Sequence, residues 1–279
     1  SMKPISVIAP GLETGKITGA TVYYNQMTSW PGNPPWRPKN STGYCDYSTM
    51  RYAIARSFNI PHAKALTDIG VDAAIDFCKK VGLPDFTGSG TSLALGGIDP
   101  GISPADHAGA YSAIANDGVY ITQTFYTKVT DNKGNVLYEP KQEENRAMTE
   151  QNAYITKNIL TETVVGSGGT ATYCAIKGMD VAAKTGTTND DYDRWLCGFT
   201  PYYTATAWFG YQISKEVKGF GQNPAGTMWA SVMKEIHANL ENAKFEEPDG
   251  IIRKSICKIS GKLASEGCTD VYTEVFTED

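Results

Sequence analysis

The chain has 279 residues, of which 41% are hydrophobic and 20% are charged, and its formal net charge is −5 at pH 7. This size supports a sizeable core in one large domain, alone or with a small appendage. The absence of a long basic run makes nucleic acids and anionic membrane surfaces poor partners, and no stretch has the apolar length that crosses a bilayer.

Six cysteines and three histidines are present. No two cysteines form a C-x-x-C pair, which argues against a structural zinc site or a haem attachment. Cys257 and Cys268 bracket a short loop. They could form a disulfide in an oxidising compartment or remain free thiols, and the spacing leaves both open.

The first half of the chain is predicted to be mostly helical. Residues 3–14 carry apolar side chains at helical spacing, Pro10 is expected to kink or shorten this helix, and Gly15 fits its end. A proline-rich surface loop is expected over 30–39, with the aromatic side chains of Trp30 and Trp36 filling gaps against the protein. A further helix is predicted over 47–56, with Ser48 or Thr49 as its N-cap. Another is predicted over 62–82, with a break near Gly70. A third is predicted over 104–117, with Pro104 in its first turn and Gly118 as its C-terminal cap.

The second half alternates strands with helices. Residues 119–138 contain D-N-K-G and predict a hairpin, and a helix is expected over 150–165. Short strands are then predicted over 178–186, 194–199 and 203–212, followed by a helix over 225–243 with one apolar face formed by Trp229, Val232, Met233, Ile236 and Leu240.

The predicted elements are helices first, then a strand meander, then a terminal helix that closes it. This order predicts an α+β fold with an antiparallel sheet. The tail after Pro248 has no clear pattern of its own. We therefore expect a main domain over 1–247 and a small C-terminal appendage over 248–279.

Lys184-Thr185-Gly186-Thr187-Thr188 ends one of the predicted strands. Facing a cleft, the lysine ammonium would attract an anionic substrate terminus and the threonine hydroxyls would bind its carboxylate. The glycine, which lacks a Cβ, would let a substrate backbone lie against the strand. Alone, this short motif is more often a strand end with a surface lysine.

Two further segments could serve the same chemistry. Ser57 and Asn59 follow a predicted helix and can point at one spot, where they could relay a proton and hold an amide. Lys3 lies at the start of the first helix, and a buried lysine beside a hydroxyl can act as a general base because desolvation lowers its pKa. Each segment alone is more often an ordinary polar turn or a solvated lysine.

A lysine at a helix start, a Ser-x-Asn turn and a Lys-Thr-Gly strand, in that order, are the motifs of β-lactamases and penicillin-binding proteins. The sequence resembles the transpeptidase domain of class A (bifunctional) penicillin-binding proteins, at least to about residue 243. The similar stretches are K-P-I-S-V-I-A-P-G-L-E-T-G-K-I-T from Lys3, A-I-A-R-S-F-N-I-P from Ala53, residues 92–111, N-D-G-V-Y at 116–120, and A-K-T-G-T-T-N-D-D-Y-D-R-W-L-C-G-F-T-P from Ala183.

The resemblance implies a penicillin-binding/β-lactamase-like transpeptidase fold, with an antiparallel sheet flanked by helices and an all-helical lobe. It implies peptidoglycan D,D-transpeptidase activity through a serine acyl-enzyme, covalently inhibited by β-lactams, with no metal or organic cofactor. Lys3, Ser57, Asn59 and Lys184 would be catalytic. The substrate-binding residues would be Thr185, Gly186, Thr187 and Thr188.

One departure from the family concerns the nucleophile. The family's first motif is Ser-x-x-Lys, which places the serine one position before Ser1, and Ser1 resembles the residue that follows it. Either the chain begins after its nucleophile, or the serine is chemically modified, for example acylated, and is left out of the written sequence. We favour the second, because a domain cut at its nucleophile would lack the family's first strands.

The implied partners are stem peptides ending in D-Ala-D-Ala, β-lactams as covalent inhibitors, and a glycosyltransferase domain upstream. The expected location is the extracytoplasmic face of the bacterial membrane, with an anchor outside this chain. Two alternatives stay open: a D,D-carboxypeptidase or β-lactamase-like hydrolase on the same fold, and a non-catalytic β-lactam sensor or wall-binding module. No glutamate stands in an assignable position for rapid deacylation.

Overall fold

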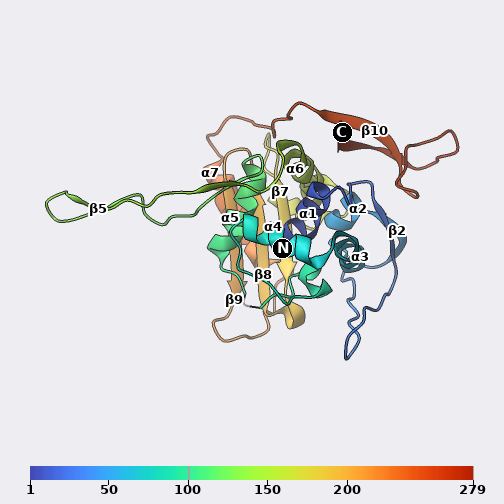
Figure 1. Cartoon of the computed structure of the whole chain (residues 1–279), viewed down its shortest axis with the longest axis horizontal. Helices are drawn as coiled ribbons and strands as arrows, with labels where there is room; N and C mark the ends of the chain where they lie inside the picture. The colour runs from blue at the N-terminus through green and yellow to red at the C-terminus, as the bar shows by residue number, and fades with distance from the viewer. Residues whose placement is uncertain (100, 279) are drawn as a thin grey trace.

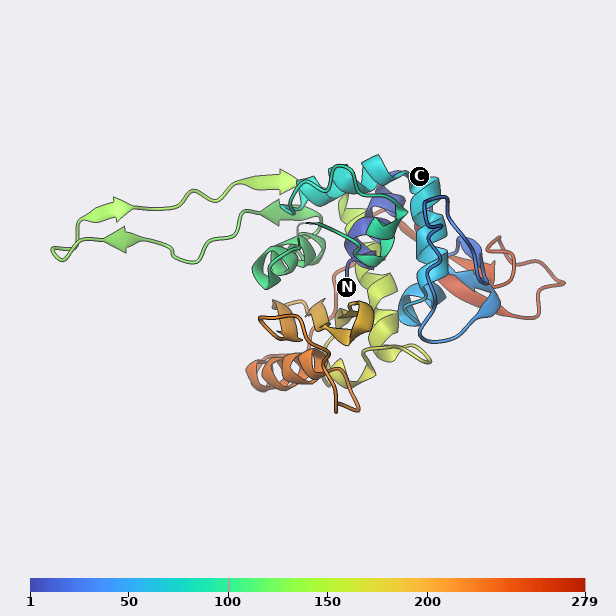
Figure 2. The same cartoon turned by 90° about the horizontal axis from the view of Figure 1, so that it is seen from below.

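A computed structural model describes residues 1–99 and 101–278 of the chain. A helical lobe and a three-stranded sheet lie side by side, a long hairpin projects from them, and a second hairpin ends the chain (Figures 1 and 2). The helices are a π-helical turn over Pro4–Ile8 continued by α1 (Ala9–Glu13), then α2 (Met50–Ala55), α3 (Asn59–Ile69), α4 (Val71–Lys80), α5 (Pro104–Ala115), α6 (Glu150–Val165) and α7 (Pro224–Ile236). The strands are β1 (Val22–Asn25), β2 (Cys45–Thr49), β3 (Val119–Ile121), β4 (Val129–Thr130), β5 (Val136–Tyr138), β6 (Glu144–Arg146), β7 (Ala182–Thr187), β8 (Asp193–Phe199), β9 (Thr204–Gly210), β10 (Ile251–Cys257) and β11 (Val271–Thr277).

The first helix runs through the centre of the helical lobe. Its residues from Pro4 to Leu12 are buried, so it is a core helix without a solvent face. Pro10 cannot donate a backbone hydrogen bond, and the turn that precedes it is π-helical. Gly15 follows the helix at φ +64°, which confirms the predicted end, because a glycine adopts this left-handed conformation without a Cβ clash.

The prediction of a helix over 47–56 was wrong at its start. Residues 45–49 form β2, which pairs antiparallel with β1, and α2 begins only at Met50. The Thr49 side chain accepts a hydrogen bond from the Tyr52 N–H, so Thr49 is the N-cap, one of the two candidates. The break predicted near Gly70 is confirmed, because α3 ends and α4 begins there.

Strands β7, β8 and β9 form an antiparallel sheet in that order. Helix α7 covers one face with Trp229 and Met233, which are 2% and 0% exposed. Helix α5 packs against β8 and β9. The prediction for α7 was too long and its apolar face too wide, because the helix ends at Ile236, and Val232 and Ile236 are 54% and 46% exposed.

The predicted hairpin after α5 is confirmed and is longer than expected. Val119 pairs with Arg146 at its base, and Val129 pairs with Tyr138 near its tip. The turn between them has Asp131 accepting a hydrogen bond from the Gly134 N–H at 3.1 Å. The hairpin extends far from the body of the protein (Figure 2).

The C-terminal hairpin of β10 and β11 lies against the helical lobe (Figure 1). Its Cys257 and Cys268 are not bonded to each other in this structure. Within residues 1–99 and 101–278, no helix is both long and apolar enough to cross a membrane.

Candidate active site

Lys3 is held at the start of the buried first helix and points toward the Ser-x-Asn turn. Its Nζ donates to Asn59 Oδ1 at 2.7 Å and to Ser57 Oγ at 3.4 Å. The residue is 9% exposed. Burial lowers the pKa of Lys3 from 10.5 to about 8, because the charged ammonium loses hydration. A lysine with this pKa can release its proton close to neutral pH.

The Ser57–Asn59 turn is built by the junction of α2 and α3. Ser57 adopts φ 56°, a left-handed conformation that is costly for a residue with a Cβ and that is common where a functional side chain must be aimed. Asn59 begins α3, and its Nδ2 donates to the Lys39 carbonyl at 2.6 Å. Its backbone N–H donates to Asn40 Oδ1 at 2.7 Å. The amide of Asn59 is therefore fixed with its oxygen toward Lys3.

Lys184 lies on β7, the strand that carries Gly186 and Thr187. It is fully buried, and its Nζ donates to the Thr185 carbonyl at 3.1 Å and to Thr185 Oγ1 at 3.3 Å. Burial and then the charge of Lys3 lower the pKa of Lys184 well below its ordinary value. The two lysines, 181 positions apart in the chain, are therefore close enough for the charge of one to affect the other.

Two neighbouring buried ammonium groups repel each other, so this environment favours a state in which one of the two lysines is neutral. Such a pair can offer one amine that accepts a proton beside one ammonium that attracts an anion. The arrangement suits acyl transfer to a hydroxyl, where a base, a relay and an anion site must lie together.

An open cleft of about 760 Å³ runs along the exposed end of β7. A Cβ placed on Gly186 would lie 2.6 Å from the backbone nitrogen of Ser1, so the glycine lets the chain at Ser1 approach the strand. Thr187 and Thr188 also line the cleft, but Thr188 Oγ1 donates to Asp193 Oδ2 at 3.0 Å within the adjoining turn. Three tryptophans contribute to its walls: Trp36, Trp195 and Trp208.

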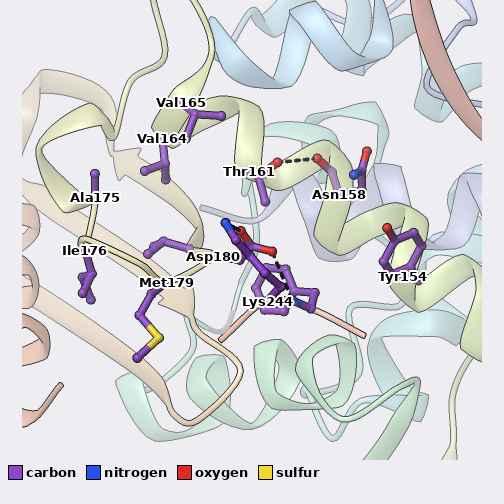
Figure 3. Close-up of a pocket in the computed structure, with 12 residues that line it drawn as sticks. Tyr154, Asn158, Thr161, Val164, Val165, Ala175, Ile176, Met179, Asp180 and Lys244 are labelled. Carbon is purple, nitrogen blue, oxygen red and sulfur yellow. Dashed lines mark hydrogen bonds and ion pairs between the residues drawn. The ribbon is translucent and has the colours of Figure 1, made fainter. Parts of the chain in front are cut away.

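A second, smaller cavity of about 340 Å³ lies between the C-terminal half of α6 and the segment that leads into β7 (Figure 3). None of the predicted site residues lines it. The cleft beside β7 is lined by the predicted residues Gly186, Thr187 and Thr188, whereas Lys3, Ser57, Asn59, Lys184 and Thr185 do not line it. Ser1, two residues before Lys3, also lines the cleft, so the cleft and the adjoining cluster of Lys3, Ser57 and Asn59 together form the candidate active site.

Three residues of the site escaped the sequence prediction. Thr170 accepts a hydrogen bond from Thr185 Oγ1 at 3.1 Å, and its only signal in the sequence is the glycine-rich stretch before it. Tyr111 donates to the Ser1 carbonyl at 2.6 Å. Asn40 orients Asn59. The last two gave no local signal, because each acts through a residue distant in the sequence.

Comparison with known proteins gives two family matches. The family model of the penicillin-binding protein transpeptidase domain matches residues 1–237, and that of the penicillin-binding protein 1A C-terminal domain matches residues 247–279. Penicillin-binding protein 1A of Clostridium botulinum (strain Hall) is 34% identical over 99% of the chain. Penicillin-binding protein 1A/1B of Bacillus subtilis is 31% identical over 100% of it. The chain spans 35% and 32% of the length of these relatives.

Solved structures share the fold. Penicillin-binding protein 1A from Haemophilus influenzae matches with a TM-score of 0.84 and 24% identity, over 99% of this chain and 47% of that one. The PonA1 protein from Mycobacterium tuberculosis, in complex with penicillin V, matches with a TM-score of 0.74 and 20% identity, over 94% of this chain and 73% of that one. The predicted α+β transpeptidase fold is thereby confirmed. The chain belongs to the family of penicillin-binding protein transpeptidase domains, in the class represented by penicillin-binding protein 1A.

Proposed function

We propose that the chain is the transpeptidase part of a cell-wall synthase that cross-links peptidoglycan stem peptides through a serine acyl-enzyme. The observation that carries the proposal is the contact of Lys3 Nζ with both Asn59 and Ser57, near a second buried lysine, Lys184, whose pKa the charge of Lys3 helps to lower. Family membership supports the same chemistry. The nucleophile is proposed to be a serine immediately before Ser1, at the point where the cleft meets Gly186.

In the first half-reaction, the serine oxygen attacks the carbonyl between two terminal D-alanines while Lys3 accepts its proton. The C–N bond then breaks, and Ser57 passes a proton to the departing amine of D-alanine. The oxyanion is stabilised by the backbone N–H groups of the serine and Thr187, each worth about 3 kcal/mol. Asn59 orients the substrate amide and Lys3.

In the second half-reaction, an amine of a neighbouring stem peptide attacks the ester. The ester C–O bond breaks, the serine regains its proton, and the new amide is the cross-link. Lys184, Thr185 and Thr187 are proposed to hold the terminal carboxylate of the donor peptide. A bound carboxylate raises the pKa of Lys184 again, so substrate binding would keep the proton on Lys184 and leave Lys3 free to act as base.

We extend the proposal to the whole protein. A glycosyltransferase domain upstream of the chain and an anchored location on the extracytoplasmic face of the membrane fit the length of the relatives and the family.

The first test is a mass measurement on the full-length protein after exposure to penicillin. We expect a mass gain of one penicillin per protein, stable over many minutes, because acyl transfer to water is slow without a dedicated base. Replacement by alanine of the residue immediately before Ser1 should abolish the gain. Rapid loss of the adduct would instead indicate a hydrolase, and no mass gain in the unchanged protein would indicate a non-catalytic binding module.

The pH dependence of acylation tests the role of Lys3. The neutral amine is the base, so the rate should rise about tenfold per pH unit below pH 8 and level off above it. The measurement is the acylation rate with a fluorescent penicillin from pH 6 to 10. A rate that keeps rising toward 10.5, the pKa of an exposed lysine, would contradict this assignment.

A further inference from the structure

The C-terminal hairpin is joined to the helical lobe by a buried ion pair. Glu274, on β11, is 0% exposed. Its carboxylate accepts hydrogen bonds from Arg51 Nε at 2.8 Å, from Arg51 Nη2, and from the Tyr272 hydroxyl at 3.1 Å. Arg51, which is 8% exposed, also donates to Asn158 Oδ1 at 2.7 Å and to its carbonyl at 3.1 Å. The guanidinium therefore links α2, α6 and the hairpin.

The local backbone is shaped to admit this carboxylate. A Cβ on Gly19 would lie 2.4 Å from Glu274 Oε2, so only a glycine leaves room for the side chain. The Gly19 carbonyl accepts a hydrogen bond from the Arg51 N–H at 3.0 Å. Burial of Arg51 acts to lower its pKa, but the hydrogen bonds to Glu274 and the neighbouring negative charges together outweigh burial, so the pKa of Arg51 is raised.

Arg51 lies in the first turn of α2, the six-residue helix that leads directly into the Ser57–Asn59 turn. Ser57 holds a left-handed conformation and contacts Lys3 at 3.4 Å. A strained turn keeps its geometry only if the elements on both sides are fixed. On the side of α3, Asn40 and Lys39 hold Asn59. On the side of α2, the C-cap Arg56 donates to the Thr42 carbonyl at 3.1 Å, and Arg51 ties the first turn of the helix to α6 and the hairpin.

The hairpin is attached a second time through the segment that precedes it. Lys244 forms an ion pair with Asp180 at 2.7 Å, and the Tyr154 hydroxyl donates to Glu247 Oε2 at 2.7 Å. These contacts border the smaller cavity, where Figure 3 shows Lys244 beside Asp180 and Tyr154 on the neighbouring helix α6. Because these contacts hold the start of the hairpin beside α6, Glu274 keeps a fixed position relative to α2.

We propose that the C-terminal hairpin is a positioning element of the transpeptidase site, in which Glu274 fixes Arg51 and thereby the α2 helix that places Ser57 beside Lys3. Arg51 and Glu274 are positioning residues and touch no substrate. A buried ion pair often gives no more stability than apolar residues of the same volume, so its fixed geometry is what the pair contributes. The inference rests on the proposed function, because it is measured through acylation.

The test replaces both partners in the full-length protein, Arg51→Met with Glu274→Met, so that no unpaired charge stays buried. We expect the limiting rate of acylation by a fluorescent penicillin to fall about tenfold to a hundredfold, as a small misplacement of catalytic groups does. The dissociation constant of the initial complex should change less than about twofold, because the carboxylate subsite on β7 is untouched. The dependence of the rate on penicillin concentration separates the two quantities.

The matched control is the exposed pair on the same hairpin, Lys258 and Asp270, which lie 2.6 Å apart. Lys258→Met with Asp270→Met should leave both constants unchanged. Unchanged acylation in a folded double variant of Arg51 and Glu274 overturns the inference. If that variant does not fold, the same result with Glu274→Gln overturns it. Failure of the unchanged protein to be acylated would refute the proposed function instead.

Discussion

Replacement of Lys3 by methionine should slow acylation by penicillin about 10²–10⁴-fold, the range for loss of a positioned general base. Lys3 Nζ lies 2.7 Å from Asn59 Oδ1 and 3.4 Å from Ser57 Oγ, where it can take the proton of a hydroxyl bound in the cleft. Methionine keeps the length and the apolar contacts of the side chain but cannot accept that proton. The measurement is the second-order rate constant for a fluorescent penicillin with the full-length protein.

The melting temperature separates this loss of catalysis from a loss of structure. Because burial lowers the pKa of Lys3 to about 8, the folded protein binds this proton more weakly than the unfolded chain does. The charged lysine therefore opposes folding below pH 8, and this opposition fades between pH 8 and 10.5, where the unfolded chain binds more protons. Lys3→Met should melt no lower than the unchanged protein at pH 7, with its advantage shrinking toward pH 10.5. A folded variant with unchanged acylation would exclude Lys3 as the base.

The sequence predicted best those elements whose ends carry local signals. Helix α6 was expected over 150–165 and is observed there, because Thr149 caps its start and a glycine-rich stretch follows its end. Helix α7 was predicted seven residues too long, since apolar residues continue past Ile236 without a glycine or proline to mark the end. Strand β2 was missed because its paired residues on β1 lie 20 to 27 positions away, and pairing at that distance leaves no local pattern.

In the candidate site, too, local sequence signals predicted some features and left others out. The order of its motifs predicted Lys3, Ser57, Asn59 and Lys184 as site residues, but not the distances between them, which depend on packing between segments far apart in the chain. The tie between Arg51 and Glu274 spans 223 positions. It could not be foreseen, because an acidic residue in a tail with no regular pattern is usually exposed. Its burial is visible only once the hairpin is placed against α2.

Replacement of Gly186 by alanine is expected to reduce acylation by penicillin about a hundredfold or more, because it disturbs the closest approach in the cleft. The added Cβ would lie 2.6 Å from the Ser1 nitrogen and 3.0 Å from Ser1 Oγ. The first of these is a backbone atom of the segment that leads into the buried helix, so a side-chain rotation cannot relieve the contact, and either β7 or this segment must move. Such a movement separates Lys184 and Thr187 from the position of the proposed nucleophile.

The strand itself can accept the alanine, since Gly186 is in β7 and does not adopt a positive φ. Overpacking of this kind usually costs about 1–3 kcal/mol, so the variant should remain folded with a lower melting temperature. The control is Gly90→Ala, where an added Cβ meets no atom within 4 Å and which should leave acylation unchanged. Full acylation of Gly186→Ala would mean that the nucleophile does not lie between the first helix and β7, and the proposed mechanism would fail at its central contact.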